Sequence, residues 1–91
     1  MQPTTIAVDV AKSVFEVAIS EQPGQVRERY RFNREGFHRF LSEQPAATVV
    51  MEAGSSAHHW ARHAEKHGHR VVLVPPHLVR PLRRPEQDRS R

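Results

Sequence analysis

Two acidic residues at the ends of apolar, β-branched stretches are the side chains of this sequence best suited to chemistry. Asp9 lies in the segment IAVDVAK at residues 6–12, and Glu52 lies in VVMEAG at residues 49–54. Strand interiors usually exclude acids. A charged oxygen at the end of a buried strand costs on the order of several kcal/mol unless a positive group meets it, and a divalent cation suits two carboxylates. The pair therefore predicts a metal site.

A structural role is the alternative for each acid, because a lone acid at a strand end more often caps a turn or a helix. Both acids, however, come shortly before small residues, Ala11 and Gly54, beside which a backbone can turn sharply. Two-metal phosphoryl transfer needs ions about 3.5–4 Å apart, and Mg²⁺ prefers octahedral oxygen coordination. Two carboxylates cannot fill both sites, so we expect further acids, and none is well placed before Pro75.

The elements that must position these acids can be read from the hydrophobic pattern. We expect helices at residues 34–43, after an Asn33 N-cap, and from Ser55 or Ser56 to His67. We expect strands at residues 4–10, 14–20, 25–32, 48–52 and 69–74. The order β-β-β-α-β-α-β predicts an α/β fold with a mixed five-stranded sheet and flanking helices. This is the ribonuclease H-like layout, in which the first and fourth strands are parallel neighbours.

Composition restricts the partners. At 91 residues the chain can form one small domain, and its formal net charge of +4 favours phosphate as a partner. The absence of cysteine excludes disulfides, thiolate zinc sites and thiol nucleophiles. No apolar stretch approaches about 18 residues, which predicts no membrane span. We therefore expect a soluble, cytoplasmic protein.

Basic residues near the acids and at the end of the chain are candidate nucleic-acid contacts. They are Lys12, Arg80, Arg83 and Arg84. A solvated loop lysine and a solvated tail are the alternative interpretations. The alternating arginines of residues 25–32 are expected on the solvated face of an edge strand.

Histidines with helical spacing form another candidate site. The set is His59, His63 and His67. This spacing can bind Zn²⁺ or Ni²⁺, but no cysteine joins the histidines, and we expect them to be exposed to solvent. His69 and His77 are likewise expected at the surface or in turns.

A series of short motifs runs along most of the chain: IAVDVAK (6–12), FN (32–33) with Gly36, VMEAG (50–54), GH (68–69) and VPPHLVRP (74–81). In this order and spacing they resemble the N-terminal domain of DEDD transposases of the IS-one-ten insertion-sequence family. The resemblance implies a RuvC-like domain that uses Mg²⁺ with DNA, with the first D on Asp9 and the E on Glu52. It also implies, for full-length members, a C-terminal serine domain and a structured guide RNA; a homo-oligomer is a further expectation.

The end of the chain departs from that family, which usually continues with KTDxxDA and so supplies the last two acids. Residues 85–91 instead read PEQDRSR. The codons CCG GAA CAA GAC CGA TCG CGC spell these residues and read RNKTDRA one base later. We therefore predict a one-base insertion near Arg84. Residues 1–81 would be the ribonuclease H-like domain, and residues 82–91 a basic, out-of-frame tail in which Asp88 is accidental.

On this interpretation the chain is the N-terminal fragment of a transposase and is inactive alone; whether it is an enzyme stays open. A non-catalytic nucleic-acid-binding or interaction fragment is the alternative, because only half a metal site is present. Actin-like sugar kinases and ATPases also begin with an apolar strand that ends in Asp. Their phosphate loop needs glycine, and residues 10–12, VAK, contain none.

Overall fold

The computed structural model describes residues 4–11, 13–22, 24–54 and 56–75. The predicted contacts Lys12, Arg80, Arg83 and Arg84, together with His77 and the predicted tail at residues 82–91, lie outside these residues. The elements are β1 (Thr5–Ala11), β2 (Val14–Ser20), β3 (Glu28–Phe32), α1 (Arg34–Glu43), β4 (Thr48–Glu52), α2 (Ala57–Lys66) and β5 (Arg70–Val74).

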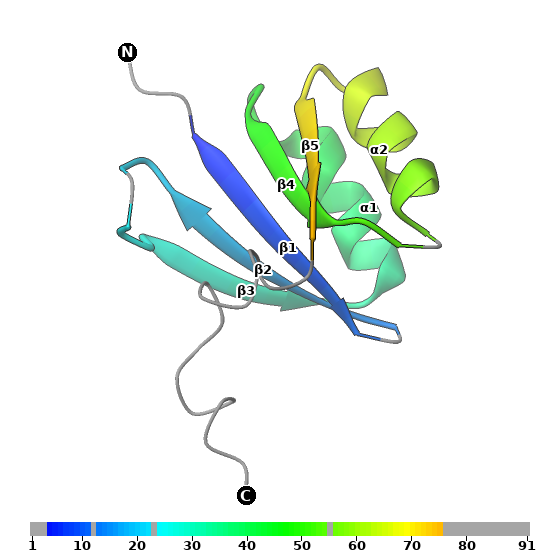
Figure 1. Ribbon diagram of the computed structural model, residues 1–91, viewed down its shortest axis with the longest axis horizontal. Helices are drawn as coiled ribbons and strands as arrows, with labels where there is room; N and C mark the ends of the chain where they lie inside the picture. Colours follow the sequence, from blue (N-terminus) through cyan, green and yellow to red (C-terminus); the bar gives the residue numbers. More distant parts are fainter. Residues whose placement is uncertain (1–3, 12, 23, 55, 76–91) are drawn as a thin grey trace, which may run out of the picture.

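The strands form one mixed sheet in the order β3-β2-β1-β4-β5 (Figure 1). Antiparallel pairing joins β1 to β2 and β2 to β3, whereas β4 is parallel to both β1 and β5. The predicted α/β class, the element order and the parallel contact of the first and fourth strands are therefore confirmed. The arrangement is compatible with a ribonuclease H-like fold.

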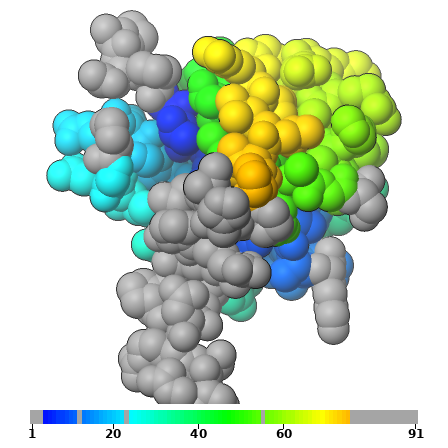
Figure 2. Space-filling view, viewed as in Figure 1, coloured from blue at the N-terminus to red at the C-terminus, as the bar shows by residue number. Residues whose placement is uncertain are grey.

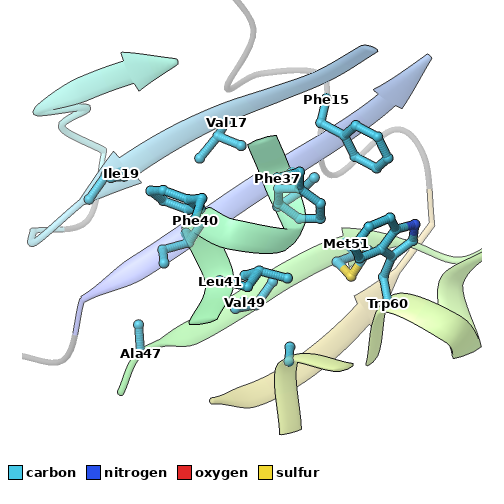
Figure 3. Close-up of a cluster of buried hydrophobic side chains, with 13 residues drawn as sticks. Phe15, Val17, Ile19, Phe37, Phe40, Leu41, Ala47, Val49, Met51 and Trp60 are labelled. Atoms are coloured by element: carbon cyan, nitrogen blue, oxygen red, sulfur yellow. The ribbon is translucent and has the colours of Figure 1, made fainter. Parts of the chain in front are cut away.

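Both described helices cover the same face of the sheet, and Figure 1 views the molecule from the opposite face, which no helix of the described residues covers and which we call the open face. Alternate strand residues point into the helix layer because side chains alternate between the two faces of a strand. The buried strand residues of this core are Ile6, Val8, Phe15, Val17, Ile19, Val49 and Met51. They pack against Phe37, Phe40 and Leu41 of α1 and against Trp60 and Ala64 of α2 (Figure 3).

An aromatic cluster fixes the two helices on the sheet. The Phe15 ring of β2 stacks on Phe37, with centroids 4.6 Å apart, and meets Trp60 edge to face at 5.1 Å. Phe37 and Trp60 also contact each other, at 4.9 Å. Aromatic pairs of this kind add about 0.5–1.5 kcal/mol each beyond the burial of their area. One β2 side chain thus joins α1 to α2.

The predicted N-cap of α1 is confirmed, because the Asn33 side chain accepts a hydrogen bond from the backbone N–H of Gly36 at 2.7 Å. At the end of α2 the backbone N–H of His69 donates to the Ala64 carbonyl at 3.0 Å, beside Gly68 with φ +91°. His69 therefore completes the helix terminus, and β5 begins one residue later than predicted. Such a glycine-containing end satisfies the last carbonyls of a helix.

The prediction that His69 lies at the surface is wrong, since only 4% of this residue is exposed. One ring nitrogen, Nε2, lies 2.7 Å from the Leu41 carbonyl oxygen, to which it must donate. The other, Nδ1, accepts the backbone N–H of Ala47 at 3.2 Å. Buried backbone groups need hydrogen-bond partners. Here a histidine supplies both, which explains its burial.

Candidate functional site

Asp9 and Glu52 lie on neighbouring parallel strands, toward the carboxyl ends of both strands, and we call this end of the sheet its edge. The β1–β4 register pairs Val8 with Met51, and one further residue along each strand brings Asp9 beside Glu52. Neighbouring strands lie about 4.8 Å apart. Asp9 is buried, with 8% of its surface exposed, and Glu52, the last residue of β4, is half-buried.

The two acids also share a face of the sheet. Val8 and Met51 point into the core beneath the helices, so the residues that follow them point to the open face. The space-filling view in Figure 2 is from this side and shows β4 in green and β5 in yellow to orange at the surface. The sheet therefore provides a rigid edge on which two carboxylates can act together, and their role as metal ligands stays a prediction.

A third acid lies in the same row across the open face. The β1–β2 register pairs Asp9 with Glu16, and the β2–β3 register pairs Glu16 with Arg31. The Glu16 carboxylate accepts a hydrogen bond from Arg31 Nη2 at 2.8 Å. The sequence did contain this signal, because Glu16 stands between Phe15 and Val17 and so shares the parity of the open face. The expectation that no further acid is well placed before Pro75 stays a prediction, since Glu16 is paired with Arg31.

Asp9 and Glu52 are the two candidate ligands among these acids. Glu16 is paired with Arg31, and in the described part of the chain no set of three or more His, Cys, Asp or Glu side chains is arranged to hold a metal ion. One Mg²⁺ can be held by one or two carboxylates when phosphate and water oxygens complete its shell. The carboxylate oxygens of Asp9 and Glu52 are suitable ligands for one such ion and are too few for a second.

The predicted exposure of the histidines on α2 is confirmed for His59 and His67, whereas His63 is half-buried. His63 packs against α1, where its ring stacks on that of His38. Sequence spacing on one helix could not reveal His38, because this residue comes from another element. Among the described residues no helix is long and apolar enough to cross a membrane.

Comparison with known proteins shows similarity to transposases, although no family model matches. The chain is 38% identical to the transposase for insertion sequence element IS1328 of Yersinia enterocolitica over 79 residues, which are 87% of this chain and 24% of that protein. It is 37% identical to a probable family 20 transposase of Pseudomonas aeruginosa over 81 residues, 89% of this chain and 24% of that protein.

A putative transposase of Sinorhizobium fredii, y4pF/y4sB, is 33% identical over 76 residues, which are 84% of this chain and 20% of that protein. The chain thus spans about a quarter or less of the length of the curated relatives it matches. All three homologues are named transposases, and the similarity extends over most of this chain.

Proposed function

We propose that this chain is part of a transposase and acts in DNA transposition, with the open-face edge at Asp9 and Glu52 as its catalytic side. The observation that carries the proposal is the β1–β4 register, which puts these two acids in neighbouring positions on adjacent parallel strands of a ribonuclease H-compatible sheet. The transposase names of relatives that match most of the chain support it.

At the finer level, the proposal is a RuvC-like, DEDD domain of the IS-one-ten family in which Asp9 and Glu52 hold Mg²⁺. When bound there, the ion would stabilise negative charge on the phosphate that is cut. The chain's own contribution is positional. Burial of Asp9 within β1 fixes one carboxylate, while the ion pair with Arg31 holds Glu16 in the neighbouring position of the row.

DNA is the proposed partner, and DNA recombination by strand cleavage and transfer is the proposed activity of the full-length protein. A structured guide RNA and a homo-oligomer belong to the same proposal for that longer protein. The 91-residue chain matches about a quarter of such a length. Because it offers two metal-ligating acids in its described part, we expect it to be inactive in cleavage alone.

Metal titration tests the site. Mn²⁺, as a paramagnetic substitute for Mg²⁺, should broaden NMR signals at the ends of β1 and β4 of the 91-residue chain. Asp9→Asn and Glu52→Gln should each weaken binding about tenfold or more, equivalent to about 1.4 kcal/mol. Glu65→Gln, at an exposed position on α2, is the matched control and should bind as the wild type does. Equal binding by all variants would show that Asp9 and Glu52 are not the metal ligands.

A non-catalytic nucleic-acid-binding fragment is the second candidate, favoured by the net charge of +4 and by the absence of a set of three metal-ligating side chains among the described residues. On this alternative, Mg²⁺ would act only as added salt and weaken DNA binding. The Asp9→Asn change would alter DNA affinity only by a small gain from the lost negative charge. The same purified protein distinguishes the two candidates when metal and DNA are titrated separately.

A further inference from the structure

A groove lies between α1 and α2, in the helix layer on the other side of the sheet from Asp9 and Glu52. Its volume is about 460 Å³. The side chains that line this histidine groove are His38, His59, Arg62, His63 and Lys66. Each lining side chain is a cation or becomes one on protonation, and no acid is among them. Such a surface favours a negatively charged ligand.

Ring contacts order the histidines of the groove. His38 and His63 stack with centroids 3.7 Å apart and an angle of 29° between their planes. His63 Nε2 lies 3.2 Å from the His38 carbonyl oxygen, to which it must donate, and the His67 ring meets His63 edge to face at 4.7 Å. The guanidinium of Arg34 lies over Trp60, 5.3 Å from the ring centroid. The groove is therefore built from packed side chains.

The electrostatics of the groove are unfavourable in the absence of an anion. Burial lowers the pKa of His38, and the charges of His63, His67, His59 and Arg34 lower it further. These are the groups that face His38 from its own helix and from α2. A bound anion would offset this mutual repulsion and would favour the protonated forms.

We propose that the histidine groove binds the phosphodiester backbone of a nucleic acid strand. Arg62 and Lys66 are one turn apart on α2, so both can contact phosphates along one line. His59 and His63 form a second such pair on the same helix. The groove is lined by side chains on a helix surface, and a long strand can cross it, whereas sites for small phosphates usually use backbone N–H groups at a closed turn.

This inference rests on the proposed function in its choice of a nucleic acid as partner, but the groove shares no residue with Asp9 and Glu52, so the metal titration and the groove variants can fail separately. The affinity of the groove should increase as the pH falls, since imidazole side chains become cations in acid solution. Burial and the neighbouring charges lower the pKa of His38, so this side chain acquires its charge at a lower pH than an ordinary histidine does. Phosphate contacts also make binding weaker at high salt.

Fluorescence anisotropy with labelled single-stranded DNA, single-stranded RNA and duplex DNA of equal length tests the proposal. The 91-residue chain should bind at least one of them about tenfold more tightly at pH 5.5 than at pH 7.5. Arg62→Gln with Lys66→Gln should weaken binding about tenfold and reduce the salt dependence by about two phosphate contacts. His59→Gln with His63→Gln should remove most of the pH dependence. The comparison of DNA with RNA identifies the strand that is preferred.

The charge-matched control is Arg29→Gln with Arg70→Gln, which removes two positive charges from exposed strand positions outside the groove. It should retain the pH dependence and lose little affinity. If the control loses affinity and the Arg62 and Lys66 variant does not, nucleic acid binds elsewhere and the proposal is wrong. Absence of binding at pH 5.5, or binding that EDTA abolishes, would overturn it as well. Circular dichroism confirms that each variant is folded.

Discussion

His69 uses both nitrogens of its ring to join two backbone segments, the last turn of α1 and the residues before β4. The Leu41 carbonyl is one of the four that the end of a helix leaves without a partner, and the imidazole donates to it. The N–H of the buried residue Ala47 donates to the other ring nitrogen. Loss of the imidazole removes the hydrogen bonds that it makes with these two backbone groups. His69 is therefore a structural residue.

We expect His69→Ala to lower the free energy of unfolding by about 2–4 kcal/mol, since each unsatisfied buried group costs about 1–3 kcal/mol. Urea denaturation followed by far-UV circular dichroism measures the change. His58→Ala, at an exposed position of α2, is the control and should change stability by less than about 0.5 kcal/mol. Equal stabilities of the two variants would show that the ring contacts of His69 contribute little.

At the residue scale, the sequence could predict placement along a strand but not contacts between elements. The positions of Asp9 and Glu52 at one edge follow from strand order alone. The pairing of Glu16 with Arg31 required the register of the β2–β3 hairpin. Burial of His69 depends on backbone groups of α1 and of the residues before β4. No periodic pattern around residue 69 indicates these contacts.

At the scale of elements, the two helices begin in different ways. Asn33 caps α1 through its side chain, whereas Ser56, the N-cap of α2, makes no such hydrogen bond. Asn33→Ala should therefore lower stability by about 1 kcal/mol, and the matched change Ser56→Ala by much less. Thermal unfolding of the two variants under one buffer condition compares them. A larger loss for Ser56→Ala would contradict this assignment of the caps.

Gly36 is coupled to the same cap. A Cβ at this position would lie 3.1 Å from Asn33 Oδ1 and 3.2 Å from Phe32 Cδ1. Alanine is otherwise favoured over glycine in a helix by about 1 kcal/mol. Gly36→Ala should thus be more favourable in the Asn33→Ala background than in the wild type, and a double-mutant cycle measures this coupling. Additive effects would show that the cap does not restrict residue 36.

Element boundaries were predictable where both ends carried a chemical signal. Asn33 and Pro45 bracket α1, and its bounds at residues 34–43 agree with the prediction. The third strand begins at Glu28 and not at residue 25. The backbone N–H of Gln25 donates to the Gln22 carbonyl, and Gly24 between them lies in a turn. Apolar and basic residues also alternate at Val26 and Arg27, so the sequence pattern could not show where the third strand begins.

For the whole molecule, a positive net charge and an incomplete metal site predict binding without cutting. The pure chain should bind duplex DNA weakly and without sequence preference, and its affinity should fall steeply with salt because phosphate contacts dominate. Gel analysis of supercoiled plasmid with Mg²⁺ should show no nicking above the background of the Asp9→Ala variant. Nicking by the wild type that is absent from Asp9→Ala would contradict the expected inactivity.

The position of β1 between β2 and β4 affects the order in which these two strands pair with it. Its pairing with β2 is between chain neighbours and can form as soon as the hairpin is synthesised, whereas its pairing with β4 closes a long loop that contains β2, β3 and α1. Long-range parallel pairing is intrinsically slow, since loop closure precedes its gain in contacts. Until β4 docks, one edge of β1 lacks a partner strand, and Asp9 has no Glu52 beside it. The acidic pair therefore forms only when β4 pairs with β1, and a nascent chain that lacks β4 cannot present it to a metal or to DNA.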